Sequence, residues 1–334
     1  MIVPKFWAEA RLQHIDEQAR KARKKGGQVT LRRFGWSDES QEAAQAHAET
    51  RAREAMARVL AGEELSRWEM KRPYNGADGM PIREEIVETR GAAVVTRNSY
   101  GARCLNTPNV LFVDMDFPEG GPFRYKVALF IVLFGLSWSM GDVVGISWGN
   151  VMARLLGALI VTPILASWLF PLAQTMQDGA QRVALGKIRR FVQANPDWNL
   201  RVYRTPLGLR VLATHRPFLS SDPQVAHCFS ALGVDPIYRK MCLLQQCFRA
   251  RVSAKPWRIG VKTRMKPQPG VWPVRPERLA ERAAWIEKYE AAAKRFAACN
   301  FIGAYGSGQE HADVEPVRVW HDELCRAQET LPLA

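Results

Sequence analysis

Residues 127–173, VALFIVLFGLSWSMGDVVGISWGNVMARLLGALIVTPILASWLFPLA, form a long apolar block in the middle of an arginine-rich chain. A helix that crosses a bilayer needs about 20 mostly apolar residues. Two such stretches fit, residues 125–146 and 151–173, with Gly149 and Asn150 at the turn between them. The block therefore predicts a transmembrane helical hairpin.

The charges around the block predict its orientation. The turn region carries Arg154 alone, whereas both flanks are rich in basic residues. The positive-inside rule then places both flanks in the cytoplasm. We expect a multi-pass protein of a bacterial inner membrane with both termini cytoplasmic. Two alternatives stay open: a helical hairpin buried in a soluble core, and a reentrant hairpin that enters the bilayer only halfway.

The polar parts of the chain predict one α/β domain that the hairpin interrupts. We expect residues 1–25 to form a basic amphipathic helix, followed by helices and strands in mixed order. The apolar run 109–114 is typical of a buried strand, and it needs partners from beyond the block. The expected strands are 28–34, 84–89, 92–96, 109–114, 199–203, 208–214 and 248–252. Residues 1–123 and 175–334 are thus the two parts of one mixed α+β sheet domain, and residues 124–174 are the hairpin.

The net charge of +14, from 47 Lys and Arg against 33 Asp and Glu, indicates polyanionic partners. Nucleic acid, nucleotides and anionic lipid headgroups all fit such an excess. In a membrane protein the same bias can follow from topology alone. The six cysteines match no zinc ribbon or zinc finger spacing, so we expect reduced, mostly buried thiols.

The stretch LFVDMDFPEGG, residues 111–121, is the sharpest candidate for chemistry. Side chains alternate along a strand, so Asp114 and Asp116 project from the same face. Two carboxylates at a strand end suit Mg²⁺ or Mn²⁺ and hence phosphate chemistry. The alternative is that the two residues only end the strand and begin a turn.

Two basic stretches are candidates for phosphate binding. In RVYRTPLGLRVLATH, residues 201–215, a Thr-Pro-x-Gly turn places arginines near a histidine, although a β-hairpin with solvated arginines explains the same pattern. In residues 249–266, basic side chains surround a tryptophan, which suits single-stranded nucleic acid or an anionic lipid surface. The candidate residues are Arg204, Arg210, His215, Arg249, Arg251, Lys255, Trp257 and Arg258.

The C-terminal His321-Asp322-Glu323 offers three metal-ligating side chains in a row. Adjacent residues on a helix do not share a face, so we interpret this stretch as the solvated start of a helix.

The chain resembles the primase-polymerase domain of the archaeo-eukaryotic primase superfamily in three features. They are the D-x-D strand, the glycine pair Gly120-Gly121, and the later strand–turn–strand with a nearby His. The resemblance implies two-metal nucleotidyl transfer, with Asp114 and Asp116 as metal ligands and His215 on phosphate. The basic segment 248–258 offers no counterpart to that family's later carboxylate. Segments such as NTPNVLFVDMDF and FRARVSAKPWR also resemble bacterial proteins of unknown function.

The sequence supports two functional hypotheses. The first is a membrane-bound, primase-like domain that handles nucleotides or other phosphates with a divalent metal. The second is a non-enzymatic, membrane-bound scaffold or nucleic-acid-binding module that lacks a complete metal site. The expected partners are a lipid bilayer and a nucleotide or nucleic acid.

Overall fold

The computed structural model describes residues 3–15, 28–71, 80–117, 130–132, 134–135, 159, 162, 179–268 and 270–334. These residues form a mixed α/β structure, and residues 179–194 are helical in addition to the labelled elements. In chain order the elements are β1 (Phe6–Ile15), β2 (Gln28–Ser37), α2 (Gln41–Leu60), β3 (Glu85–Arg90), β4 (Ala93–Arg97), β5 (Arg103–Thr107), β6 (Phe112–Asp116), β7 (Asn199–Thr205), β8 (Gly208–Ala213), α5 (Pro223–Leu232), α6 (Pro236–Gln245), β9 (Phe248–Arg251), the 3₁₀ turns η3 (Pro256–Ile259) and η4 (Pro276–Arg278), α7 (Leu279–Ala293), β10 (Asn300–Gly306) and α8 (Glu315–Cys325).

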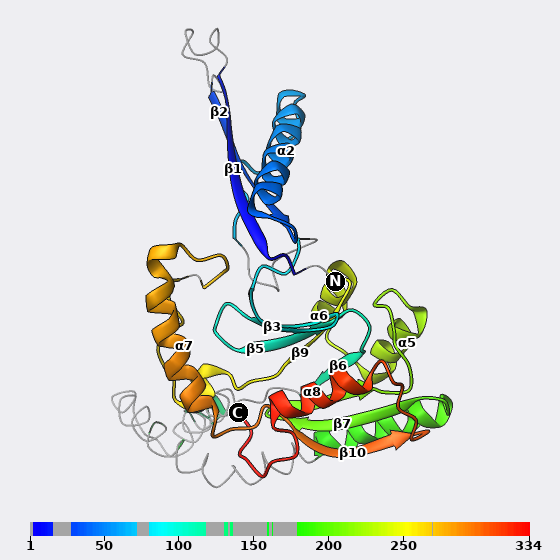
Figure 1. Cartoon of the computed structure of the whole chain (residues 1–334). Helices are drawn as coiled ribbons and strands as arrows, with labels where there is room; N and C mark the ends of the chain where they lie inside the picture. Colours follow the sequence, from blue (N-terminus) through cyan, green and yellow to red (C-terminus); the bar gives the residue numbers. More distant parts are fainter. Residues whose placement is uncertain are drawn as a thin grey trace.

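The first two strands and α2 form a unit that projects from the rest of the molecule (Figure 1). β1 and β2 pair antiparallel over their full lengths, with Phe6 opposite Ser37 and Ile15 opposite Gln28. Alternate residues of β1 pack with an alanine face of α2, whose buried members recur at helical spacing: Ala44, Ala48, Ala52 and Ala55. Small side chains on both sides let the helix lie close to the hairpin.

Gly35 in β2 shows how close that approach is. A Cβ atom added to Gly35 would lie 2.2 Å from the backbone nitrogen of Ala48 and 2.3 Å from the carbonyl oxygen of Ala44. Only a residue without a side chain fits there. Ser40 caps the helix by accepting a hydrogen bond from the backbone of Ala43 at 3.1 Å.

The structure corrects the prediction of an N-terminal helix over residues 1–25. Phe6–Ile15 is a strand, because Ala8, Ala10 and Leu12 recur with a period of two and face α2. The remaining residues of that predicted helix lie largely outside the described residues.

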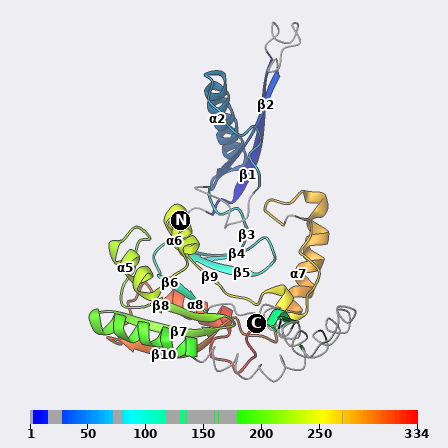
Figure 2. The ribbon, with the colours of Figure 1, turned by 180° about the vertical axis from the view of Figure 1, so that it is seen from behind.

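Two four-stranded antiparallel sheets make up the body of the molecule (Figures 1 and 2). The first has the order β3-β4-β5-β9, and the second has the order β10-β7-β8-β6. β6 precedes the apolar block and β8 follows it, yet they are neighbours, with Asp114 directly opposite Arg210. Strands from both sides of the block therefore share one sheet.

Two side chains connect the sheets to each other. The hydroxyl of Tyr238, on α6, lies 3.1 Å from the carbonyl oxygen of Phe112 in β6 and 3.0 Å from that of Arg249 in β9. The guanidinium of Arg210 in β8 donates to the carbonyl oxygen of Arg251 at 2.7 Å. Through Arg210, the strand next to β6 is tied to the end of β9.

The main hydrophobic core surrounds the second sheet. Residues 179–194 contribute Ile188 and Phe191, and α8 contributes Trp320 and Cys325. Figure 1 shows α8 running along this sheet, close to β7 and β10. The strands predicted around residues 109–114, 199–203 and 208–214 are confirmed as β6, β7 and β8. β7 and β8 are the central strands of this sheet, whereas β6 lies at its edge.

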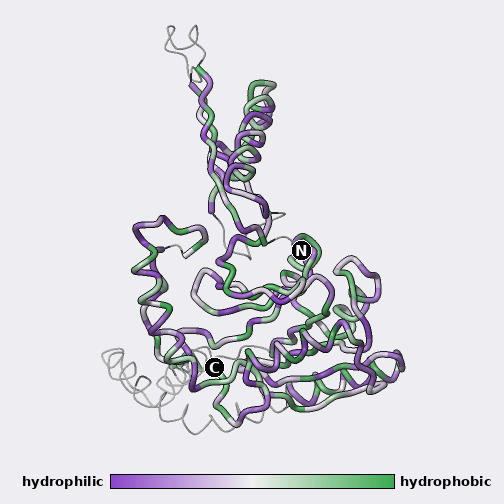
Figure 3. The backbone as a smooth tube through the Cα atoms, viewed as in Figure 1, coloured by the Kyte–Doolittle hydropathy of each residue, from purple (hydrophilic) through white to green (hydrophobic). Residues whose placement is uncertain are grey.

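The predicted transmembrane hairpin is contradicted. Among the helices formed by the described residues, none is both long enough and apolar enough to cross a membrane. α2 is long enough, with 20 residues, but its sequence includes the charged residues Glu49, Arg51 and Arg53. Figure 3 shows hydrophilic and hydrophobic positions mixed along this helix. We therefore correct the fold class to mixed α/β, with no membrane-spanning helix among the described residues, and withdraw the multi-pass membrane localisation. Most of the two predicted spans, 125–146 and 151–173, lies outside the described residues.

Candidate functional site

The predicted metal-binding carboxylate Asp114 is engaged by an arginine. Arg210 Nε donates to Asp114 Oδ1 at 2.8 Å, and Arg210 Nη2 donates to Asp114 Oδ2 at 3.1 Å. Burial alone would raise the pKa of Asp114, but the charge and hydrogen bonds of Arg210 outweigh it and lower that pKa. Both carboxylate oxygens thus face a fixed cation where a metal ion would have to bind.

The second predicted carboxylate, Asp116, is exposed at the end of β6. Its strand partner is Gly208, at the turn between β7 and β8. A Cβ atom on Gly208 would lie 2.0 Å from the carbonyl oxygen of Met115, so this glycine is required by the close approach of β6. The glycine of the Thr-Pro-x-Gly turn therefore has a structural role.

His215 lies beyond the end of β8, against the aromatic rings of Trp198 and Phe218. Its Nδ1 accepts a hydrogen bond from the backbone of Asn199 at 3.3 Å. Burial and, to a lesser extent, the charge of Arg216 lower the pKa of His215 to about 4. A neutral imidazole in an aromatic cluster is a weak partner for phosphate.

The candidate arginines differ in their surroundings. Arg249 is buried and makes a bidentate pair with Glu84, with Nη2 at 2.8 and 2.7 Å from the two carboxylate oxygens. Its Nη1 donates to Asn106 Oδ1 at 2.8 Å. Arg204 lies over the ring of Phe117, 4.9 Å from its centroid. Arg249 therefore stabilises the first sheet and is not displayed to a ligand.

The basic segment after β9 is displayed at the surface. Trp257 is 56% exposed, with Lys255 Nζ 5.5 Å from its ring centroid and Tyr100 packed edge-on against it. Arg251 and Arg258 are partly buried on either side of Lys255. Residues 236–276 contain ten Lys and Arg and no Asp or Glu. This segment combines positive charge with an exposed aromatic side chain.

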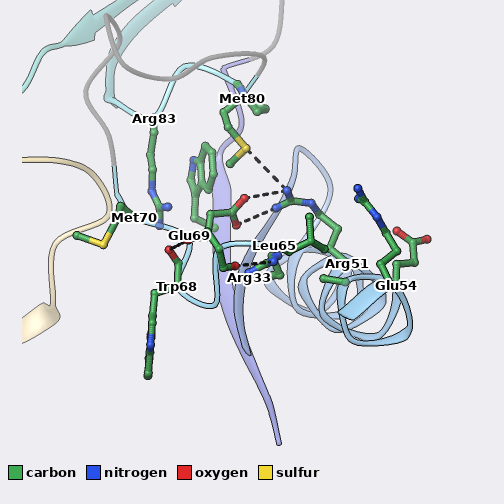
Figure 4. A pocket seen from close by; sticks show the side chains of 14 residues that line it. Arg33, Arg51, Glu54, Leu65, Trp68, Glu69, Met70, Met80 and Arg83 are labelled. Carbon is green, nitrogen blue, oxygen red and sulfur yellow. Dashed lines mark hydrogen bonds and ion pairs between the residues drawn. The ribbon is translucent and has the colours of Figure 1, made fainter. Parts of the chain in front are cut away.

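A pocket at the base of the projecting unit was missed by the sequence analysis (Figure 4). It has a volume of about 410 Å³ and lies between α2, β2 and the segment after α2. Four arginines and two glutamates line it, which gives the lining a net charge of +2: Arg33, Arg51, Arg58, Arg83, Glu54 and Glu69. A pocket of this size is in the usual range for small-molecule sites.

The negative charge of Glu69 is already paired with the guanidinium of Arg51. Its two oxygens accept hydrogen bonds from Arg51 at 2.9 and 3.0 Å, and the backbone of Phe34 donates to Oε2 at 2.6 Å. Figure 4 shows Arg51 and Arg83 on opposite sides of Glu69, with dashed lines from the carboxylate of Glu69 to the guanidinium of Arg51. Glu69 therefore positions Arg51, and no carboxylate of the described residues forms an ion pair with Arg83.

Arg83 is the most unusual side chain of the pocket. It is 6% exposed, and its guanidinium lies over Phe34 and Trp7, 3.8 and 4.4 Å from the ring centroids. Its Nε donates to the carbonyl oxygen of Trp272 at 2.7 Å. Within the described part of the chain, neither terminal nitrogen has a hydrogen-bond partner. Burial lowers the pKa of Arg83 to about 10.

An aromatic side chain stands at the edge of the same pocket. Trp68 is 45% exposed, with the guanidinium of Arg32 5.3 Å from its ring centroid. The other nearly buried arginine, Arg33, donates to the carbonyl oxygens of Arg32 and Ser66 at 2.8 and 2.9 Å. Among the residues that the structure describes, the pocket thus combines an exposed indole with a guanidinium whose terminal nitrogens have no partner.

The sequence contained little signal for this pocket. Trp68 and Arg83 lie on either side of the turn-rich residues 71–81, which show no helical or strand periodicity, so nothing in the sequence indicates that the two side chains meet. A strand over residues 28–34 was expected and is confirmed as part of β2. Which of its arginines lines the pocket depends on the hairpin register, which the sequence alone does not provide.

Comparisons with protein-family models, with curated proteins and with solved structures found no match for this chain.

Proposed function

We propose that this protein is a nucleic-acid-binding module that binds single strands, with a phosphate group held by Arg83 and a base stacked on Trp68. The observation that carries the proposal is the buried guanidinium of Arg83, whose terminal nitrogens have no partner among the described residues. A buried charge without a counter-ion is costly, and an anionic ligand removes that cost.

A phosphate matches the chemistry of this pocket. The guanidinium fork presents parallel N–H donors that fit two phosphate oxygens, and the pocket lining has a net charge of +2. Exposed aromatic rings beside basic groups are how many proteins bind single strands, since every base offers a flat face. Trp68 with Arg32 provides this combination at the edge of the pocket.

The basic segment, residues 236–276, extends the same surface. Arg83 Nε contacts the carbonyl oxygen of Trp272, and Lys71 Nζ contacts that of Pro273 at 3.1 Å. The C-terminal end of residues 236–276 therefore touches the pocket. Further along that segment, Trp257 with Lys255 forms a second aromatic and basic pair. A strand that leaves the pocket has a continuous basic segment to follow.

The same geometry favours binding over metal-dependent catalysis. Arg210 occupies both oxygens of Asp114, and the neutral His215 is packed against aromatic rings. These contacts support the second of the two hypotheses, without its membrane attachment.

The test is binding of labelled oligonucleotides, measured by fluorescence anisotropy at low salt, with single and double strands of equal length. We expect tighter binding of single strands, and we expect Arg83→Met to weaken it roughly tenfold or more, the effect of losing a charge-assisted hydrogen bond. Arg53→Met is the matched control, because Arg53 is exposed on α2 and its recorded side-chain contact is with Thr50.

Three results would contradict the proposal. They are the absence of binding by the wild-type protein, equal affinity of wild type and Arg83→Met, and an equal loss in Arg53→Met. Preference for the duplex would remove the stacking role of Trp68.

A further inference from the structure

Three soft metal-ligating side chains meet between α8 and the start of β10. Cys325 Sγ lies 3.4 Å from His321 Nε2, and Cys299 Sγ lies 4.0 Å from the same atom. The three ligand atoms all lie within 4.8 Å of one another, and each residue is at most 1% exposed. The proposed nucleic-acid binding uses none of these residues.

The local structure explains why they meet. His321 and Cys325 are one turn apart on α8 and therefore share a face of the helix. Cys299 comes directly before β10, whose neighbour is β7. The backbone of Ala298 donates to the carbonyl oxygen of Cys325 at 3.0 Å, which holds the two cysteine-bearing segments together.

The spacing of the three atoms suits a tetrahedral ion. Zinc binds thiolate sulfur at about 2.3 Å and imidazole nitrogen at about 2.0–2.1 Å, so a sulfur and a nitrogen on one ion are roughly 3.5 Å apart. The two measured separations, 3.4 and 4.0 Å, bracket that value. Two thiolates and an imidazole are also a preferred donor set for zinc.

A carboxylate orients the histidine toward the sulfur atoms. His321 Nδ1 lies 3.0 Å from Asp322 Oδ1, and Asp322 Oδ2 accepts a hydrogen bond from Arg201 at 3.0 Å. A carboxylate on Nδ1 keeps the proton there and leaves the Nε2 lone pair for a metal. The histidine thus has the second partner that metal-binding histidines commonly have.

The charges around the cluster are compatible with a divalent ion. Arg210 Nη1 faces the cluster from β8 and lies 3.4 Å from His321 Nε2, within hydrogen-bonding distance. A metal ion on Nε2 replaces this contact, and Arg210 keeps Asp114 and the carbonyl oxygen of Arg251 as partners. Two thiolates offset the charge of a divalent ion, so binding adds no net charge to the core. The protons released by the two thiols go to solvent.

We propose that Cys299, His321 and Cys325 bind a thiophilic metal ion, Zn²⁺, as a structural clamp between α8 and β10. The three side chains supply three of the four ligands of a tetrahedral ion. Because the ligands are buried in the core, the ion stabilises the fold and reaches no substrate.

The first test uses the reduced full-length protein. It is freed of metal with a chelator and titrated with Co²⁺, which reports thiolate ligation by a charge-transfer absorption band, and then with Zn²⁺. We expect one equivalent of Co²⁺ to produce the band, Zn²⁺ to abolish it, and Zn²⁺ to raise the melting temperature. Absence of a thiolate band in the wild-type protein would overturn the proposal, whatever the variants do.

The variants assign the band to the cluster. Cys299→Ser and Cys325→Ser are each expected to lose most of it, whereas Cys228→Ser, a buried cysteine of α5, keeps it. An unchanged band in both cluster variants would place the ion elsewhere and refute the site. Mass spectrometry adds a further check: a Cys299–Cys325 disulfide, together with no metal uptake after its reduction, would identify a redox pair and overturn the metal site.

Discussion

Arg210 and Asp114 face each other across β8 and β6, joined by hydrogen bonds of 2.8 and 3.1 Å to both carboxylate oxygens. Arg210 is 1% exposed and also donates to the carbonyl oxygen of Arg251. A buried arginine that joins two sheets needs its counter-ion, because an unpaired charge in the core is expensive. The pair is therefore part of the structure of the sheet.

We expect Asp114→Ala to lower the free energy of unfolding by roughly 1–3 kcal/mol, since it leaves the buried guanidinium of Arg210 without its carboxylate partner, while the Asp114 side chain is itself 35% exposed and partly screened by water. Asp116→Ala is the control, because Asp116 is exposed and its loss should change stability by no more than about 0.5 kcal/mol. Urea denaturation followed by circular dichroism measures both. Equal small effects would show that Arg210 does not depend on Asp114.

We expect the stability of the protein to depend on the charge of Arg51 but much less on that of Arg83. Arg51→Met should lower the free energy of unfolding by about 1–3 kcal/mol, because Glu69 loses its bidentate partner. Arg83→Met should keep it within about 1 kcal/mol of wild type, because Met retains the apolar stem over Trp7 and removes an unpaired charge. Thermal or urea unfolding provides the comparison. A large loss in Arg83→Met would mean that Arg83 serves stability and not a ligand.

The sequence predicted the strands β6, β7 and β8 well, but it did not predict which side chains these strands bring together. Asp114 and Arg210 were both named, as a metal ligand and a phosphate ligand, and their pairing depends on a register across 96 positions that no local pattern encodes. Residues 1–25 were assigned to a helix because their charge suggested an amphipathic face. The period-two recurrence of Ala8, Ala10 and Leu12 indicated the strand that the structure shows.

The cysteine and histidine cluster was missed for a similar reason. His321 was grouped with Asp322 and Glu323, which suggested a solvated helix start, whereas the structure buries His321 completely. The useful signal was the spacing His321-x-x-x-Cys325, which places both side chains on one face of a helix. Cys299 joins them only through the tertiary packing of β10. The expectation of reduced, mostly buried thiols, in contrast, is confirmed, since all six cysteines are free and buried.

The basic segment, residues 236–276, should determine the salt dependence of nucleic-acid binding. Lys262 and Arg264 are exposed, and each phosphate contact on a single strand contributes about 0.7 to the slope of log affinity against log salt. We expect Lys262→Ala with Arg264→Ala to reduce that slope by about 1.4. Lys288→Ala, an exposed lysine on α7, is the control and should leave it unchanged. An unaltered slope in the double variant would exclude this segment from the phosphate contacts.

The depressed pKa of His215 predicts a pH dependence of stability. Burial and the charge of Arg216 lower its pKa to about 4 in the folded protein, below the ordinary value of 6.5. Between these values the unfolded chain binds the proton more readily, so the contribution of His215 to stability is complete above about pH 6.5 and is lost as the pH falls toward 4.

The variant His215→Asn isolates that contribution. Its amide oxygen can accept the hydrogen bond that the backbone of Asn199 donates to Nδ1 in the wild type, but it does not titrate. We expect the rise in unfolding free energy between pH 4 and 6.5 to be shallower in His215→Asn, measured by urea unfolding at a series of pH values. Identical profiles would mean that His215 is protonated in the folded state at mildly acidic pH. It would then carry the positive charge that a phosphate contact at this position requires, and the low pKa would no longer argue against a phosphate-binding role.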